Sequence, residues 1–315
     1  MAVVRIGIGA ASPPARAGRD TFLKYLDTLE AQGWDSLWFS DRIVGPGWVI
    51  DPIVGMSMIA AHTKKLKFGT SVLLMSVRSP VAMARALGTI DFMSNGRLIL
   101  GVGVGQEADT EYVAMGVRKN DRGKRLDEAI MLMRRLWTED KVTHASPFTR
   151  LADAQLYPKP AQANVPIWIG GRTEAAIKRT GLMGDGWLPT QVTVDEVARG
   201  IAQVRRYAAD AGRQVPDDHF GVQLGCYIVE NGPVPMDKVG QHLLRRRTDV
   251  GLEQLHLLGT AEQVNARLRE LIDAGATKFV LNPACGMDEL WRQLELQSEL
   301  VVRPWHAKKD AVGAG

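Results

Sequence analysis

The chain has 315 residues and a mass of 34.5 kDa, which exceeds the usual ~100–200 residues of one domain but suits a single α/β barrel. Hydrophobic residues make up 45% and charged residues 23%, so a globular core can form, and a disordered or fibrous protein is excluded. The 39 basic and 35 acidic residues leave a net charge of only +4, spread along the chain, which argues against a nucleic-acid or membrane partner.

Neither the cysteines nor the histidines form a metal-binding pattern. Cys226 and Cys285 are too few for a disulfide framework or a four-cysteine zinc site, and they suit a reducing compartment. The six histidines show no His-x-His or His-Glu-x-x-His spacing, so we expect no protein-held metal.

No apolar run reaches the ~18–20 residues of a membrane span, and the apolar start at 3–8 lacks a basic leader. We therefore expect a soluble cytoplasmic protein.

Short apolar runs alternate with amphipathic segments, as in βα units on a parallel sheet. In the first half, the pattern predicts strands at 3–10, 35–40, 67–73 and 97–104, with helices at 20–32, from Pro52, at 80–93 and at 123–138. In the second half, it predicts strands at 165–170, 186–189, 220–229 and 278–281, with helices at 174–184, 193–211, 261–274 and 288–302. Eight such units favour a single α/β domain that closes as a (β/α)8 TIM barrel over an open doubly wound sheet, because eight parallel strands close around a side-chain-filled interior.

Two segments do not fit this alternation. The stretch at 139–164 is polar, contains three prolines and is predicted to be an inserted loop or hairpin that could cover a site. The segment at 230–258 carries an arginine-rich helix near 237–248, which we expect to be an exposed insertion. The predicted organisation is therefore one barrel over 1–305 with two insertions, followed by a flexible C-terminal tail over 306–315.

In a barrel the chemistry lies at the carboxyl ends of the strands. These predicted ends are Ala10, Asp41, Ser71, Gly105, Gly170, Thr190 and Asn282. After the fourth strand, the glycine-rich run at 101–108 contains a G-x-G-x-x-A match to a dinucleotide fingerprint. This run does not open a nucleotide-binding half, and no long helix follows it at once, so glycines that make room at a strand end explain it better.

The turn at 170–173 is a candidate phosphate site. Gly170-Gly171-Arg172-Thr173 ends a strand and leads directly into the helix that begins near Glu174. Exposed N–H groups at a helix start, a threonine cap and a guanidinium all suit a phosphate, and phosphate loops occur in the second half of barrels. An ordinary loop with a threonine cap is the alternative.

Several short motifs also follow one another in a distinctive order. They are GWDSLW at 33–38 with Ser40-Asp41, GTSVL at 69–73, NGRL at 95–98, GVGVG at 101–105, RLDE at 125–128, VPIWIGG at 165–171, GDGW at 184–187 and GTAEQV at 259–264. From about 3 to 302, this series resembles the luciferase-like flavin and deazaflavin oxidoreductases of the luciferase-like monooxygenase superfamily. The branch it resembles most uses the deazaflavin coenzyme F-420.

The resemblance implies a coenzyme that lies across the carboxyl end of the barrel, with Asp41 beside its redox ring and a non-proline cis peptide behind the ring at Ser71-Val72. The other coenzyme contacts that it implies are Gln106, Ala108 and Asp109 at the polar edge or ribityl chain, Gly170, Gly171, Arg172 and Thr173 at the phosphate, and Gly186 with Trp187 on the neighbouring wall. It further implies a small-molecule substrate, a homodimer and a separate enzyme that reduces the coenzyme.

Two residues depart from the family pattern. Arg42 stands where many deazaflavin members have histidine. Arginine is a poor general acid or base, although it can hold an anionic deazaflavin or polarise a carbonyl. Gln106 stands where sugar-phosphate dehydrogenase relatives have glutamate. We therefore expect hydride transfer that reduces an electron-poor carbonyl or alkene rather than oxidation of a sugar lactol.

The candidate catalytic residues are Arg42, Trp48 and Glu107. Trp48 could stack on substrate or close the mouth, or it could only anchor its loop. Glu107 could relay a proton or be a solvated carboxylate. The first alternative function is an FMN-dependent monooxygenase supplied by a separate reductase. The second is a noncatalytic flavin- or deazaflavin-binding protein, because Arg42 replaces the family's proton donor.

Overall fold

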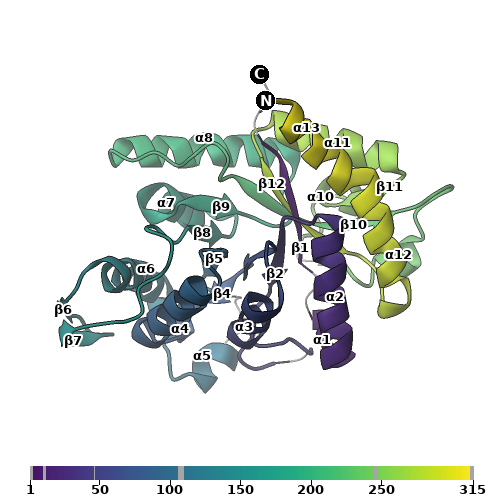
Figure 1. Cartoon of the computed structure of the whole chain (residues 1–315). Helices are drawn as coiled ribbons and strands as arrows, with labels where there is room; N and C mark the ends of the chain where they lie inside the picture. The colour runs from purple at the N-terminus through teal and green to yellow at the C-terminus, as the bar shows by residue number, and fades with distance from the viewer. Residues whose placement is uncertain (1–2, 10–11, 46, 106–109, 244–246, 313–315) are drawn as a thin grey trace. The chain divides into compact units, whose positions relative to one another are not determined.

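The structure is a computed structural model that describes residues 3–9, 12–45, 47–105, 110–243 and 247–312. Its contacts divide the chain into two compact units, a terminal unit formed by 1–38 and 169–315 and a middle unit formed by 39–168. Helices and strands alternate in both units (Figure 1). The single domain expected over 1–305 stays a prediction. Within the described ranges, no helix is both long and apolar enough to cross a membrane.

Parallel strands form the sheet of the terminal unit. They are β1 (Arg5–Ile8), β2 (Ser36–Phe39), β8 (Ile167–Gly170), β9 (Gly186–Leu188), β10 (Gly221–Ile228), β11 (Leu257–Gly259) and β12 (Lys278–Pro283), of which β2 and β8 share residues with the middle unit. β12 lies between β1 and β10, β2 pairs with the other edge of β1, and β11 pairs with β10. Parallel bridges from Trp187 to Phe220 and from Thr190 to Gln223 join β9 and its following residues to β10.

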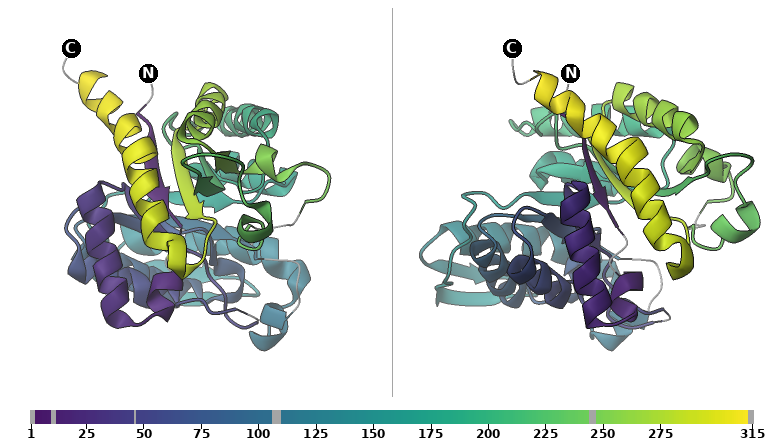
Figure 2. Two further views of the ribbon diagram at one scale, coloured as in Figure 1. Left: turned by 90° about the vertical axis from the view of Figure 1, so that its right-hand side faces the viewer. Right: turned by 45° about the vertical axis from the view of Figure 1, so that its right-hand side comes forward.

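The terminal unit also contains helices. They are α1 (Ser12–Arg16), α2 (Arg19–Gln32), α7 (Glu174–Met183), α8 (Val194–Asp210), α9 (Met236–Val239), α10 (Leu252–Leu255), α11 (Ala261–Asp273), α12 (Met287–Gln297) and α13 (Arg303–Val312). A π-helical turn joins α12 to α13, and together they form one long rod (yellow in Figure 2). Ile6 N in β1 donates to His306 Nε2 in α13 at 3.1 Å. The expected flexible tail over 306–315 is therefore helical up to Val312, and 313–315 lie outside the described residues.

Two of the sequence motifs of the terminal unit are explained by structural contacts. In GWDSLW, Asp35 forms an ion pair with the buried Lys278 of β12, whose Nζ also donates to Ser36 Oγ at 2.8 Å. In GTAEQV, Thr260 and Gln263 form a reciprocal capping box at the start of α11. Such a box satisfies two backbone N–H groups at a helix start. These motifs therefore stabilise the fold.

The arginine-rich helix predicted near 237–248 is wrong in length. α9 ends at Val239, and Gly240 follows it. Glycine has a low helix propensity, which disfavours continuation of this helix. Residues 244–246 lie outside the described part of the chain.

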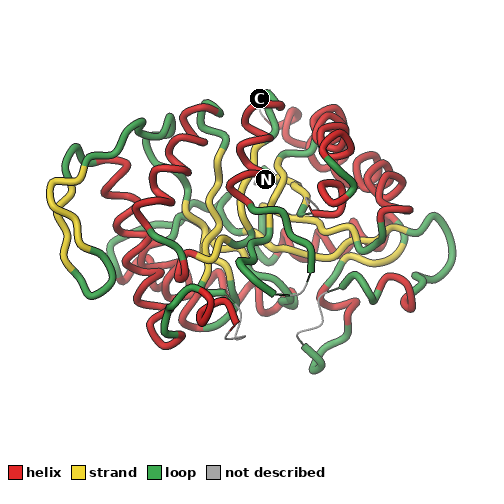
Figure 3. The backbone as a smooth tube through the Cα atoms, turned by 90° about the horizontal axis from the view of Figure 1, so that it is seen from below, coloured by secondary structure: helices red, strands yellow, loops and turns green. Residues whose placement is uncertain are grey.

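The middle unit contains β3 (Lys67–Thr70), β4 (Leu73–Leu74), β5 (Leu98–Gly103), the hairpin β6 (Val142–Ala145) with β7 (Arg150–Ala154), and helices α3 (Pro52–His62), α4 (Pro80–Met93), α5 (Thr110–Ala114) and α6 (Arg122–Thr138). β3 and β4 both pair in parallel with β5. The strand predicted at 67–73 is thus interrupted at Ser71-Val72. The polar insertion predicted at 139–164 contains the β6–β7 hairpin, which projects beyond the helices of this unit (Figure 3).

Arg97, in the motif NGRL, connects three elements of the middle unit. Asn95 and Gly96 have φ values of 57° and 77° and form the turn that places Arg97 at the start of β5. The Arg97 guanidinium donates to Thr63 Oγ1 at 2.7 Å and to the carbonyls of Leu66 and Ala60, each at 2.9 Å. The motif therefore fixes the end of α3 against the starts of β3 and β5.

Candidate active site

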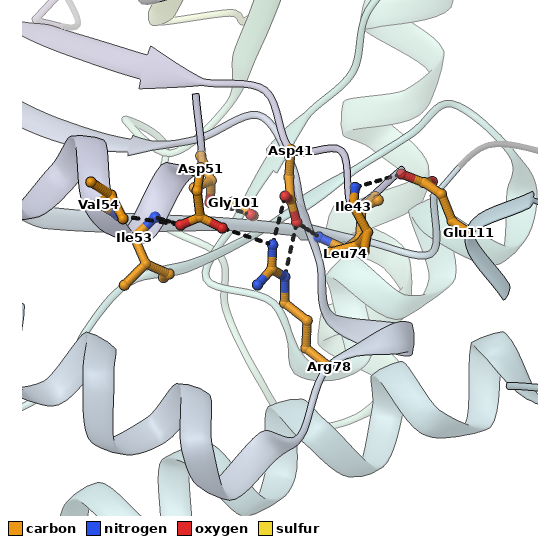
Figure 4. Close-up of polar contacts among 10 residues, drawn as sticks. Asp41, Ile43, Asp51, Ile53, Val54, Leu74, Arg78, Gly101 and Glu111 are labelled. Carbon is orange, nitrogen blue, oxygen red and sulfur yellow. Dashed lines mark hydrogen bonds and ion pairs between the residues drawn. The ribbon is translucent and has the colours of Figure 1, made fainter. Parts of the chain in front are cut away.

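Polar contacts of the middle unit gather where β2 and β3 end (Figure 4). The Asp41 side chain is fully buried, and the Arg78 side chain is 12% exposed. Arg78 Nε donates to Asp41 Oδ2 at 3.0 Å, and Arg78 Nη2 donates to Asp41 Oδ1 at 2.7 Å. Leu74 N donates to Asp41 Oδ2 at 3.0 Å. A bidentate ion pair and a backbone N–H therefore hold the Asp41 side chain in place.

A second carboxylate lies on the same guanidinium. Asp51 caps α3, since its Oδ1 accepts from Ile53 N at 2.8 Å, and its Oδ2 lies 3.6 Å from Arg78 Nη2. Burial alone would lower the pKa of Arg78, but the hydrogen bonds and charges of Asp41 and Asp51 outweigh it, so the pKa is raised. The Arg78 guanidinium therefore stays charged and cannot act as a general acid near neutral pH.

The segment after β3 has the backbone that the resemblance implied. The peptide bond between Ser71 and Val72 is cis. Ser71 N donates to Phe39 O at 2.7 Å, and a Cβ atom on Gly103 would come within 2.5 Å of Val72 Cγ2. Ser71 Oγ is buried, and it has no hydrogen-bond partner among the described residues. A buried hydroxyl of this kind suits a polar group of a bound ligand.

The glycine run at the end of β5 leaves room for neighbouring side chains, in agreement with the interpretation of the sequence. Gly105 has φ 87°, and a Cβ atom there would lie 3.2 Å from Tyr112 Oη. The Tyr112 hydroxyl and Ser76 Oγ both donate to Val104 O. Burial raises the pKa of Tyr112, which keeps this hydroxyl neutral. The predicted contacts Gln106, Ala108 and Asp109 and the candidate Glu107 lie outside the described residues.

Two candidate catalytic residues lie in the loop between β2 and α3. Arg42 is half-buried, and its side chain lies along its own loop, where a Cβ atom on Gly45 would be 3.4 Å from Arg42 Nη1. Trp48 is 47% exposed. Ile43 N donates to Glu111 Oε1 at 2.9 Å, which ties the start of this loop to α5.

Several contacts fix the backbone of the candidate phosphate turn in the terminal unit. Gly171 has φ 104°, a conformation that favours glycine. Thr173 caps α7, because its side chain accepts from Ala176 N at 3.3 Å, and Trp187 Nε1 donates to Gly171 O at 2.8 Å. A pocket of ≈ 220 Å³ adjoins the turn and is lined in part by Arg172, Trp187 and Arg199.

The predicted site residues thus fall into two groups. Asp41, Ser71 and Val72 lie in the middle unit, and Gly170, Gly171, Arg172, Thr173, Gly186 and Trp187 lie in the terminal unit. The coenzyme contacts assigned to them stay predictions. Sequence reasoning missed Arg78, because a lone arginine before the helix start Ser79-Pro80 has no local pattern that indicates a buried carboxylate partner.

The two cysteines lie outside both groups of candidate residues. Both cysteines are unpaired and buried, and burial, with nearby acidic residues, raises the pKa of Cys285 to about 12. Neither thiol is therefore a nucleophile near neutral pH. Within the described ranges, no cluster of histidine, cysteine, aspartate or glutamate is arranged to hold a metal ion.

An α/β fold with polar side chains at the carboxyl ends of its parallel strands is the arrangement of barrel enzymes. The chain belongs to the luciferase-like monooxygenase family, whose model matches residues 3–246. Over 310 residues it is 33% identical to the F-420-dependent glucose-6-phosphate dehydrogenase of Amycolatopsis mediterranei, with 87% of this chain and 92% of that protein covered.

Two solved structures share the fold. Monooxygenase RslO1 from Streptomyces bottropensis matches with a TM-score of 0.81 and 21% identity, over 96% of this chain and 99% of that chain. An F-420-dependent secondary alcohol dehydrogenase, solved with an F-420–acetone adduct, matches with a TM-score of 0.78 and 21% identity, over 96% and 99% of the two chains. These likenesses confirm the predicted α/β fold of the TIM-barrel type.

Proposed function

We propose that this chain is an oxidoreductase that transfers hydride between coenzyme F-420 and a small organic substrate. The observation that carries the proposal is the group of contacts around Ser71-Val72, where a buried hydroxyl without a partner among the described residues adjoins a valine packed on Gly103. Membership of the family and 33% identity to an F-420-dependent dehydrogenase over most of the chain support this coenzyme.

Within each unit, the residues present suit one part of a deazaflavin. Val72 would support the ring, and Ser71 Oγ is free to hydrogen-bond its polar edge. Gly171, Arg172 and Thr173 would hold the phosphate through backbone N–H groups, a hydroxyl and a guanidinium. When bound, a deazaflavin supplies a carbon that gives or accepts hydride.

The protein's own side chains position the substrate, polarise it and exclude water from it. Arg42 carries a fixed positive charge that can stabilise negative charge on a carbonyl oxygen, and Trp48 offers an exposed aromatic face to a substrate. Arg42 is a poor proton donor near neutral pH. We therefore propose reduction of an electron-poor carbonyl or alkene, in which the proton comes from solvent or another group.

A turnover assay tests this proposal. The protein is mixed anaerobically with reduced F-420 and a panel of electron-poor ketones and enones, and the return of oxidised deazaflavin is followed. Turnover with members of this panel is expected. Turnover only with oxidised F-420 and sugar phosphates would overturn the substrate class. Turnover only with reduced FMN and oxygen would support the monooxygenase instead, and tight coenzyme binding without turnover of any substrate would support a noncatalytic binding protein.

Arg172→Ala is expected to weaken coenzyme binding about tenfold or more, because a charge-assisted hydrogen bond of ~1.5–3 kcal/mol is lost. The measurement is the dissociation constant of F-420 in low salt. Arg199→Ala is the matched control, since Arg199 is an exposed arginine of the same pocket but lies on α8. An unchanged dissociation constant for the Arg172 variant would refute the phosphate assignment.

Arg42→Ala is expected to lower kcat or coenzyme affinity, and Arg42→Lys is expected to recover only part of the loss, because lysine lacks the bidentate fork. The rate between about pH 5 and 9 should show the same pH profile in the wild type and in Arg42→Lys, since both residue types ordinarily carry a positive charge throughout that range. Full turnover and normal coenzyme binding in Arg42→Ala would show that this arginine does not serve the reaction.

A further inference from the structure

One guanidinium contacts both ends of the loop that carries two candidate catalytic residues. The loop at 42–50 runs from Asp41 at the end of β2 to Asp51 at the start of α3. Arg78 donates to both Asp41 oxygens, at 3.0 and 2.7 Å, and its Nη2 lies 3.6 Å from Asp51 Oδ2 (Figure 4). Arg78 itself lies outside the loop, two residues before α4.

The two contacts differ in burial. The Asp41 side chain is fully buried and the Arg78 side chain nearly so, whereas the Asp51 side chain is 47% exposed. Buried charge-assisted pairs resist competition from water and salt, while exposed pairs are screened. The ion pair between Arg78 and Asp41 is therefore the stronger of the two contacts, and the ion pair between Arg78 and Asp51 is the weaker.

The Asp41 carboxylate also connects the loop to the segment after Ser71-Val72. Leu74 N donates to Asp41 Oδ2 at 3.0 Å, beside the bond from Arg78 Nε to the same oxygen. If the guanidinium were removed, this fully buried carboxylate would keep Leu74 N as its one hydrogen-bond donor among the described residues. The residues that follow β2 would then lose the ion pair between Asp41 and Arg78 that holds them in place.

The described residues at the centre of the loop, 44, 45, 47 and 48, are exposed. Val44 is 38% exposed and Trp48 is 47% exposed, and Gly45 and Gly47 have φ values of 129° and 99°. Loops with few buried apolar contacts open locally at low free-energy cost. The contacts at the two ends of the loop, the bond from Ile43 N to Glu111 and the packing of Ile43 against a hydrophobic cluster therefore constrain the positions of Arg42 and Trp48.

We propose that Arg78 is a positioning residue that clamps the 42–50 loop at both ends and thereby orients Arg42 and Trp48. The clamp itself is a property of the free protein. Its consequence for turnover rests on the proposed function. Arg78 touches neither substrate nor coenzyme in this proposal and acts through Asp41 and Asp51.

The test is amide hydrogen exchange of the full chain without coenzyme, read by mass spectrometry on peptides that cover 42–50. Arg78→Met is expected to speed exchange in this loop about tenfold or more, with α4 and β5 unchanged. The exchange rate of the loop in Arg78→Lys should fall between the rates in the wild type and in Arg78→Met, because one ammonium group cannot reproduce the bidentate contact of a guanidinium. Arg85→Met, at an exposed arginine of α4, should exchange like the wild type.

Asp51→Asn is the second variant, because Arg78→Met leaves a buried carboxylate and could fail to fold. Asparagine caps helices as well as aspartate does, so the start of α3 is kept while the charge attraction to Arg78 is removed. We expect faster exchange in the second half of the loop only. Wild-type exchange in the loop of both Asp51→Asn and Arg78→Lys would overturn the clamp, as would equal acceleration throughout the middle unit.

Turnover separates the clamp from the proposed function. With F-420 and a substrate of the wild type, Arg78→Lys should lower kcat severalfold while the coenzyme dissociation constant changes less. If the loop exchanges faster in the variants but the wild type shows no turnover with F-420, the clamp stands and the proposed function fails. If the wild type turns over and loop exchange is unaltered in the variants, the proposed function stands and the clamp fails.

Discussion

Gly103→Ala is expected to weaken coenzyme binding about tenfold or more while the middle unit stays folded. The new Cβ atom would come within 2.5 Å of Val72 Cγ2, so Val72 must move. Valine is branched at Cβ and has few alternative rotamers, so its backbone would shift with it. Val72 is the residue proposed to support the redox ring. Titration with F-420 measures the loss, and the thermal midpoint reports whether the fold is kept.

The double variant Val72→Ala with Gly103→Ala is the control for this prediction. Removing the two Cγ atoms of Val72 creates the space that the new methyl group needs, so the double variant should bind F-420 better than Gly103→Ala alone. A double-mutant cycle then gives a coupling energy between the two positions. If Gly103→Ala binds as the wild type does, or if the two changes add independently, Val72 does not support the ring.

Arg97→Ala is expected to lower the free energy of unfolding by about 3–5 kcal/mol, because each hydrogen bond from a charged donor contributes ~1.5–3 kcal/mol and its acceptors lose their partner. Those acceptors are Thr63 Oγ1 and the carbonyls of Leu66, Ala60 and Ser94. Denaturation in urea, followed by circular dichroism, measures the change. Arg85→Ala, at an exposed position of α4, serves as the control.

The affinity of Arg97→Ala for F-420 should be close to that of the wild type at a temperature where the variant is folded. NGRL is one of the motifs that resemble the family, yet its arginine makes contacts at the opposite ends of the strands from Ser71 and Gly103. A large loss of affinity with little loss of stability would place Arg97 in the coenzyme site, contrary to the contacts that it makes.

The regular elements could be predicted closely because local signals mark them. The helix expected at 80–93 begins at Pro80, and Ser79 caps it, so its bounds follow from two adjacent residues. The strand expected at 67–73 is divided in the structure at the cis peptide bond Ser71-Val72. Strand propensity gives no signal for such a bond, so the division was not predicted from it. The helix expected near 237–248 is limited to α9, where Gly240 outweighs the surrounding helix formers.

The site was predictable only in part, for a physical reason. Ser71 and Val72 belong to a continuous motif, so the resemblance identifies them. The Asp41–Arg78 pair joins residues 37 positions apart. Only the fold brings these two side chains together, and a lone arginine before a helix start has no local pattern that indicates a buried carboxylate partner.

Titration of the protein with F-420 and with FMN, each in the oxidised and reduced form, tests the central proposal most directly. We expect saturable binding of F-420 with a dissociation constant about tenfold or more below that of FMN. Arg172→Ala and Gly103→Ala should both weaken the binding of F-420. Saturable binding of FMN with no measurable binding of F-420 in either redox state would contradict the assignment of this chain as an F-420-dependent oxidoreductase.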